Sequence, residues 1–284
     1  MSGMLQFDEA GARRLEAVYT TPDVVGQRRE VRRILGLRPG EHVVDVGAGP
    51  GLLAAEMAAE VGPAGRVHAV EPSESMRALA AARTRAPAAT PETAPVEIAP
   101  VEIAPVEIMA GSADALPLPD ASVDAAVSTQ VLEYVADVPG ALAEVRRVLR
   151  PGGRLLVLDT DWDSIVWHSR DAARTARILA AWDEHLADPH LPRTLAPTLR
   201  AAGFTQVRTH VLPLLNVGYD PNTFSAMNAS TIGAFVTGRA GIDDADVRDW
   251  IDDVTSLGDA AFFSLNRYVF LASKPVRPLP ASPG

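Results

Sequence analysis

The stretch from Val43 to Gly51 constrains the fold of this chain more than any other part of its sequence. Three of its first four residues are valine, and a continuous apolar run of β-formers predicts a short strand buried on both faces. Glycines follow at alternate positions, and glycine permits positive φ and close approach of a ligand to the backbone. The pattern is helical from Leu52 to Val61, so N–H groups of its first turn point at the loop. The loop is therefore either a phosphate or nucleotide site or a plain strand-to-helix connection.

The next predicted strand, Arg66 to Val70, decides between these interpretations because it is followed by an acid. Glu71 lies about twenty residues past the glycines, where a doubly wound fold places the residue that binds ribose hydroxyls. The motif Asp45-Val46-Gly47-Ala48-Gly49-Pro50-Gly51 resembles the Asp-x-Gly-x-Gly-x-Gly of class I S-adenosylmethionine (SAM)-dependent methyltransferases. In a nicotinamide fingerprint, Gly-x-Gly-x-x-Gly, the third glycine would come one residue later.

The resemblance implies SAM as the cofactor, S-adenosylhomocysteine as the product and a defined set of contacts. Glu71 would accept from the ribose hydroxyls. Asp114, in Ala113-Asp114-Ala115-Leu116-Pro117, would accept from the adenine amino group, although a turn cap is the alternative. The other cofactor contacts that it implies are Tyr19, Arg28, Asp45, Gly47, Ala48, Gly49, Gly51, Pro72, Met76, Ala113, Ala115, Gln130 and Val131.

Composition narrows the possible partners. The chain has 284 residues, 47% of them hydrophobic, which is enough to bury a sizeable core. Its formal net charge of −10 argues against a phosphate-backbone partner, which requires a basic face. It has no cysteine, so disulfides and thiolate metal sites are excluded. We find neither an apolar run long enough to cross a bilayer nor a signal pattern, and we expect a cytoplasmic protein without a membrane partner.

Strand and helix patterns alternate along the chain, which predicts an α/β fold. We expect a Rossmann-like, doubly wound sheet of seven mostly parallel strands with an antiparallel last strand. N-terminal helices and a helical insertion between strands six and seven would complete it. The predicted divisions are a helical cap at 1–38, a SAM-binding core at 39–214, a helical lid at 215–260, the last core strand at 261–274 and a disordered tail at 275–284.

A five-residue repeat, Pro-Val-Glu-Ile-Ala, begins at Pro95 and Pro100 and starts again at Pro105. Its unit is too short for a solenoid. The last copy leads directly into Gly111-Ser112-Ala113-Asp114, so we expect the third strand at Val106 to Met109. The upstream copies carry a proline every fifth residue, which is typical of an exposed extended loop, and we assign an insertion to 88–105.

The segment from Asp159 to His168 follows the fifth strand, where open α/β sheets place their chemistry. His168 is the predicted general base, because histidine changes protonation near neutral pH, and Asp161 would replace or orient it. The alternative for His168 is a hydrogen-bonded surface residue. No metal is expected. The predicted substrate contacts are Tyr134, Trp162, Trp167, Phe224 and Met227, although the apolar face that contains Phe224 and Met227 can simply be core.

Within its class the chain is most similar to the ubiquinone/menaquinone-biosynthesis branch and related natural-product enzymes. We therefore expect methyl transfer to an oxygen or carbon of a small phenolic, quinoid or similar molecule, by a monomer or homodimer. Two alternatives remain at this point. One is an RNA or protein methyltransferase, and the other is a SAM-binding fold that does not transfer methyl groups.

Overall fold

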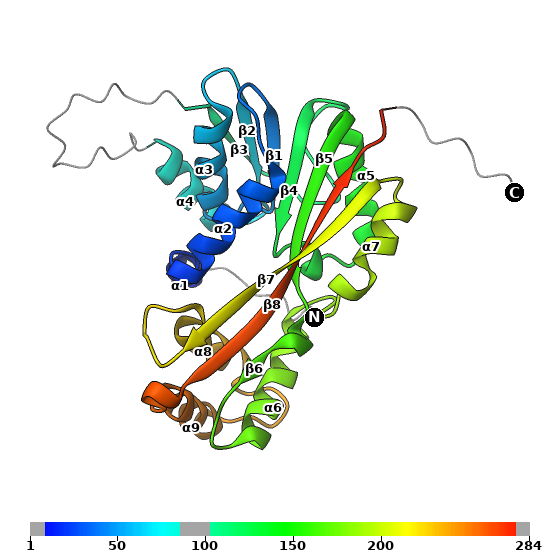
Figure 1. The fold of residues 1–284 in the computed structure, drawn as a ribbon. Helices are drawn as coiled ribbons and strands as arrows, with labels where there is room; N and C mark the ends of the chain where they lie inside the picture. The colour runs from blue at the N-terminus through cyan, green and yellow to red at the C-terminus, as the bar shows by residue number, and fades with distance from the viewer. Residues whose placement is uncertain (1–8, 86–102, 277–284) are drawn as a thin grey trace, which may run out of the picture.

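The computed structural model describes residues 9–85 and 103–276, and its centre is an eight-stranded sheet (Figure 1). The strand order is β3-β2-β1-β4-β5-β8-β6, with β7 paired to β8. Strands β1 to β5 run parallel, whereas β8 is antiparallel to β5, β6 and β7. The predicted fold class is confirmed, with short β6 as the strand that the sequence did not predict. The strands are β1 His42–Val46, β2 Arg66–Val70, β3 Val106–Met109, β4 Val123–Thr129, β5 Leu149–Thr160, β6 Val166–Trp167, β7 Thr205–Val217 and β8 Phe262–Ser273.

Helices cover both faces of the sheet, which explains why β1 is a continuous run of apolar residues around Asp45. Val43 packs in a core shared with α2 and α3, whereas Val44 and Val46 point the other way into a core shared with α5 and α7. The α-helices are α1 Glu9–Tyr19, α2 Pro22–Leu35, α3 Leu52–Val61, α4 Glu74–Arg85, α5 Val138–Val148, α6 Ala172–Trp182, α7 Pro192–Ala201, α8 Phe224–Val236 and α9 Asp244–Thr255.

The last copy of the five-residue repeat forms β3, as predicted, and pairs with β2 through Val67 and Val106. After the predicted insertion, the packed core resumes slightly before residue 105, where the insertion was predicted to end. Ala104 is buried and its N–H donates to the Ala58 carbonyl over 3.0 Å, and Pro105 accepts from Val67 over 3.1 Å. The rest of the predicted insertion falls almost entirely on residues 86–102, which lie outside the described residues, as does the predicted tail from 277 onward.

A second lobe, made of β6, α6, α8, α9 and the outer ends of β7 and β8, projects beyond the parallel sheet (Figure 1). It exists because β7 and β8 stay paired out to Val217 and Phe262, whereas the pairing of β5 with β8 stops at Thr160 and Arg267. The predicted helices of the insertion are α8 and α9. Helix α6, which lies within the predicted core range 39–214, packs its apolar side against α8 and α9.

Among the helices within residues 9–85 and 103–276, none combines the length and apolar content that a bilayer crossing requires.

Arg154 on β5 fastens the end of α2 to the sheet. Its guanidinium donates to the carbonyls of Leu35 over 2.7 Å and Gly36 over 2.8 Å, and forms an ion pair with Glu41 at 2.7 Å. The two side chains are only 19% and 14% exposed, so this pair is shielded from water. Arg154 therefore ties α2, which carries part of the predicted cofactor cap, to the centre of the sheet.

Replacing Arg154 with Ala should lower the free energy of unfolding by about 2–4 kcal/mol, because it leaves a half-buried carboxylate and two carbonyls without their charged donor. Urea unfolding measures this. The matched control is Arg33→Ala, which breaks an exposed ion pair with Glu30 on the same helix and should cost less than about 0.5 kcal/mol. Equal losses in the two variants would contradict this role for Arg154.

Candidate active site

The predicted cofactor residues converge at one edge of the sheet, because parallel strands end on the same side. Val46 is level with Val70 on β2 and with Ser128 on β4. The glycine loop, Glu71 and Gln130 follow these strand ends directly and therefore lie together. The structure thus assembles, in space, three sequence motifs that are far apart in the chain.

The glycine loop is packed by protein at two positions and open at the third. The three loop glycines have φ values of 71°, 53° and 74°, which favour glycine. A Cβ on Gly47 would lie 2.4 Å from a Val131 methyl group, and one on Gly51 would lie 2.8 Å from the Ala80 Cβ. A Cβ on Gly49 would meet nothing within 4 Å. Gly49 is therefore where a ligand can lie against the loop.

Glu71 closes the loop from the neighbouring strand. Its carboxylate accepts from the N–H of Gly49 over 2.9 Å and from that of Ser73 over 2.8 Å. Burial raises the pKa of Glu71, and these hydrogen bonds only partly offset that effect. Each carboxylate oxygen keeps a second lone pair, so the arrangement fits the predicted acceptance from ribose hydroxyls.

Asp45 lies beneath the loop and is 1% exposed, and its Oδ2 atom has no hydrogen-bond partner among the described residues. Burial, followed by the negative charges of Glu71 and Glu56, raises the pKa of Asp45 to about 7. An unpartnered buried carboxyl oxygen fits a site that is completed by a donor from a ligand.

The adenine-side residues remain a prediction. Asp114 is exposed and accepts from the Ser112 hydroxyl. Ala113 is buried beside it and Ala115 is exposed. Past Glu71, Met76 is buried and Pro72 is exposed.

Gln130 holds a backbone conformation that is rare for a residue with a side chain. Its φ is 57°, and such strain clusters at functional sites. Its Oε1 accepts from the Thr160 hydroxyl over 2.9 Å, whereas its buried Nε2 has no partner among the described residues. Val131 donates its N–H to Asp159 Oδ1 over 3.1 Å. Together these contacts leave a free donor next to the loop.

Three buried ionisable residues that the sequence analysis did not select lie beside Gln130, namely Asp159, Glu133 and Arg267. Burial raises the pKa of both carboxyl groups. The negative charge of Glu133 raises the pKa of Asp159 further. Glu133 accepts from the Thr160 N–H and the Trp162 indole, each over 3.3 Å. The sequence did contain a signal for Arg267, which is the one charged residue in β8.

Tyr19 and Arg28, both predicted cofactor contacts, lie on the N-terminal helices α1 and α2, and Arg28 is engaged by the protein. Its guanidinium donates to the Tyr19 carbonyl and to Glu56 over 2.9 Å. It therefore holds the cap to α3. Burial raises the pKa of Tyr19 to about 12, so its hydroxyl stays protonated at neutral pH.

His168 does not lie with the predicted cofactor residues. It is exposed on the second lobe, where its backbone N–H donates to the Phe262 carbonyl over 2.9 Å. Phe262 is five residues along β8 from Arg267, which is about 17 Å of strand. Trp167, which directly precedes His168, packs against Trp250 and Phe263 inside the lobe. The segment after β5 leads away from the sheet edge, which the sequence could not show.

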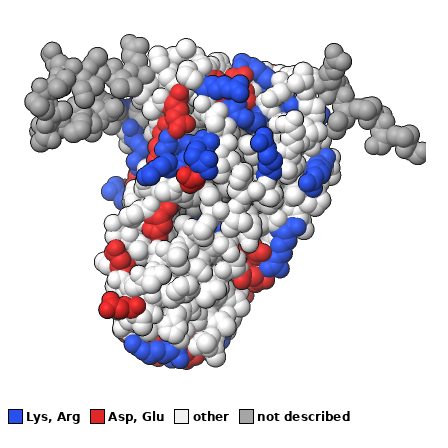
Figure 2. Space-filling model, in the orientation of Figure 1, with Lys and Arg blue, Asp and Glu red and all other residues white. Residues whose placement is uncertain are grey.

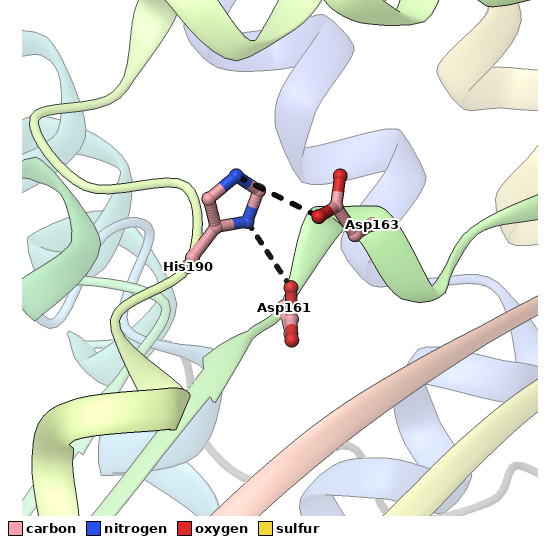
Figure 3. Close-up of side chains that lie close together, drawn as sticks. All are labelled: Asp161, Asp163 and His190. Atoms are coloured by element: carbon pink, nitrogen blue, oxygen red, sulfur yellow. Dashed lines mark hydrogen bonds and ion pairs between the residues drawn. The ribbon is translucent and has the colours of Figure 1, made fainter.

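Asp161 forms a surface cluster with Asp163 and His190 (Figure 3). Their ligand atoms lie within 4.8 Å of one another, close enough for a metal ion, but Arg193 already binds Asp161 at 2.8 Å and pairs with Asp163 as well. Partial burial by itself raises the pKa of Asp161, but hydrogen bonds from Arg193 and His190 outweigh this and lower it. This cluster is an ion-pair network around Arg193, and the lowered pKa makes Asp161 a weaker proton acceptor.

Apart from Trp167, which packs inside the second lobe, the predicted substrate residues lie on two sides of the edge. Trp162 is buried and contacts Glu133, and the ring of Tyr134 lies 5.7 Å from that of buried His185. On the other side Phe224 is buried in a cluster that Met227 packs against, and the Arg267 guanidinium lies 4.8 Å from the centre of its ring. Phe224 is therefore a core residue next to the site and Met227 is partly buried beside it, and their contact with a substrate stays a prediction.

Comparison with known proteins supports the sequence-based resemblance. A family model described as a methyltransferase domain matches residues 44–157. The chain is 32% identical over 274 residues to an "Uncharacterized 37.1 kDa protein in transposon TN4556" of Streptomyces fradiae, covering 91% of this chain and 70% of that protein. It is 30% identical over 206 residues to the demethylmenaquinone methyltransferase of Symbiobacterium thermophilum, covering 66% and 77%.

The fold is similar to that of Haemonchus contortus phosphoethanolamine N-methyltransferase 2, solved in complex with SAM. The TM-score is 0.58 at 18% identity, and the match covers 95% of this chain and 58% of that chain.

Gly47→Ala should cost about 3 kcal/mol or more of stability and weaken SAM binding. The new Cβ would overlap Val131, and the alanine would also have to hold a positive φ. Gly40→Ala is the matched control. Its φ is 84° but nothing lies within 4 Å, so only backbone strain of about 1–2 kcal/mol is expected, with SAM binding unchanged. Urea unfolding and calorimetric titration with SAM measure both effects. Indistinguishable variants would mean that the close packing at Gly47 is unimportant.

Asp45 should make the protein without SAM less stable as the pH rises. Because its pKa is about 7 when folded and lower when unfolded, the folded state keeps an extra proton between those values, and stability falls through that window. The unfolding free energy of Asp45→Asn relative to wild type should therefore increase by about 2–4 kcal/mol between about pH 4.5 and about pH 8.

Asp124→Asn is the control for this titration. Burial favours a higher pKa for Asp124, but hydrogen bonds from the His42 N–H and Arg150 outweigh it and lower the pKa, so this group stays ionised throughout. Its relative stability should be flat over the same range. A flat profile for Asp45→Asn as well would show that Asp45 titrates normally.

Proposed function

The chain belongs to the class I SAM-dependent methyltransferases, and from this premise we propose that it methylates an oxygen or carbon of a small phenolic, quinoid or related natural-product molecule. The observation that carries the proposal is the enclosure of the polar cluster at the sheet edge. Glu133, Asp159 and Arg267 are each at most 3% exposed. The name of the demethylmenaquinone relative supports the quinoid class.

Two separate parts of the chain close over this edge. Helix α1 packs against α8 of the second lobe, and Val18 and Val24 share an apolar cluster with Phe224. A methyl acceptor beside Gln130 would therefore be surrounded by protein. Such a site favours a small molecule over an RNA or a folded protein, whose reactive group must project from a large surface.

Charge also disfavours an RNA substrate. In the view of Figure 2, basic side chains in the upper half lie among acidic ones, and much of the lower half carries neither. The arginines of α2 illustrate this, because Arg28 and Arg32 pair with Glu56, and Arg33 pairs with Glu30. A continuous basic face, as phosphate-backbone binding requires, is not present in this view.

The residues at the sheet edge would have separate roles in cofactor binding and in proton transfer. SAM, when bound, supplies an electrophilic methyl group. Glu71 and the open backbone at Gly49 would hold the nucleoside, and Asp45 and the free Gln130 amide would hold the polar end of the cofactor. Exclusion of water and fixed positioning supply much of the rate.

We propose Glu133, in place of His168, as the general base that takes a proton from the methylated substrate group. It lies at the edge itself, and burial raises its pKa, which suits a base that must hold a proton near neutral pH. Cytoplasmic location and a monomeric or homodimeric state are further parts of this proposal.

Incubation of the protein with methyl-labelled SAM and an extract of the source organism tests the function. Label should appear in small organic solutes. Glu133→Gln should slow transfer by about 10²-fold or more, a typical general-base contribution, without changing SAM affinity. His168→Ala, an exposed site on the second lobe, should leave the rate unchanged.

Other outcomes have distinct meanings. Label in RNA or protein would replace the proposal with a macromolecular substrate, and no transfer with SAM bound would indicate another use of the fold. A slow His168→Ala variant beside a normal Glu133→Gln variant would restore His168 as the base.

A further inference from the structure

Arg267 is a buried cation that the roles described above leave unused. It lies on β8 between β5 and β7, opposite Thr160 and Leu212, so its backbone is held by strands on both sides. It is 3% exposed. A charged side chain at the centre of a sheet is costly unless something compensates the charge.

Protein groups hold the guanidinium in place but do not neutralise it directly. Nη1 donates to the Gln27 side-chain oxygen, and the Phe224 ring lies against the planar group at 4.8 Å. The Nε–H is buried without an acceptor, and no carboxylate within residues 9–85 and 103–276 forms an ion pair with Arg267. A rigid donor is therefore available to a ligand.

The acids whose charges act on Arg267 accept hydrogen bonds from other donors. Asp23 accepts from the Asn216 amide over 2.8 Å and from the Phe224 N–H over 2.9 Å. Glu133 accepts from Thr160 and Trp162, and Asp159 from Val131. Within the described residues the guanidinium donates to Gln27 and forms no ion pair with these acids, whose charges act on it without direct contact, so an anion that enters the site can still pair with Arg267.

We propose that Arg267 binds an anionic oxygen of the methyl acceptor, such as a carboxylate, phenolate or enolate. The inference rests on the proposed function and narrows its substrate class. The carboxylate of SAM has the same chemistry, but position favours the acceptor. Arg267 lies three strand positions from β1, about 14 Å across the sheet from the strand that ends in the glycine loop. The planar guanidinium suits an oxyanion because it offers parallel donors.

Anion binding to the protein loaded with S-adenosylhomocysteine tests this without requiring methyl transfer. The probes are 4-hydroxybenzoate and its neutral analogue 4-hydroxybenzamide, and the readout is the Arg267 Nε–H resonance, assigned by its loss in Arg267→Gln. The resonance should shift saturably with the benzoate, which should bind about 10- to 100-fold more tightly than the amide.

Variants separate the possible anion sources. Arg267→Gln should abolish the preference for the benzoate while SAM affinity, measured by calorimetry, changes less than about twofold. Arg208→Gln, an exposed arginine on β7, should keep the preference. Arg267→Lys retains the charge and should keep a weaker preference, which allows the test to proceed if the Gln variant does not fold.

Equal binding of the two probes to wild type, or no shift with either, would overturn the inference. So would a large loss of SAM affinity in Arg267→Gln, which would assign the guanidinium to the cofactor carboxylate. A clear benzoate preference without any methyl transfer would support the anion site and count against the proposed function alone.

Discussion

The parallel pairing of β1 with both β2 and β4 is the interaction on which the rest of the structure depends. It sets Val46, Val70 and Ser128 level, so the segments that follow them must share one edge. The pairing requires helices on both faces, and that requirement explains the apolar sequence of the strands. The glycine loop then turns back over this edge, because its positive φ values favour glycine and because a Cβ at Gly47 or Gly51 would clash with Val131 or Ala80.

A second constraint comes from the length of β8. This strand pairs with β5 inside the sheet and continues beyond it with β7, so the same element supports the core and the second lobe. Arg267 lies where the pairing with β5 ends. The lobe, the N-terminal helices and the sheet edge therefore meet around one side chain, which makes the acceptor region a product of three parts of the chain.

The site concentrates ionisable groups that a stable core would exclude. Asp45, Glu133, Asp159 and Arg267 are all nearly inaccessible to water, and three buried polar atoms among them have no partner among the described residues. Such groups destabilise the fold locally, and the apolar clusters on both sides of the sheet offset the cost. Unsatisfied polar atoms at a strand edge are typical of a site that is completed by ligands.

Local sequence patterns were enough to predict the parallel sheet, the strand at the last repeat copy, and the meeting of the glycine loop with Glu71 and Gln130. These follow from local patterns, because each motif is adjacent to a strand end and parallel strands end together. The place of His168 on the second lobe, the packing of α6 with α8 and α9, and the direction of Arg267 toward the site depend instead on tertiary contacts. Those features depend on how far β8 continues past β5 and on the direction of the chain after Thr160, and strand periodicity fixes neither.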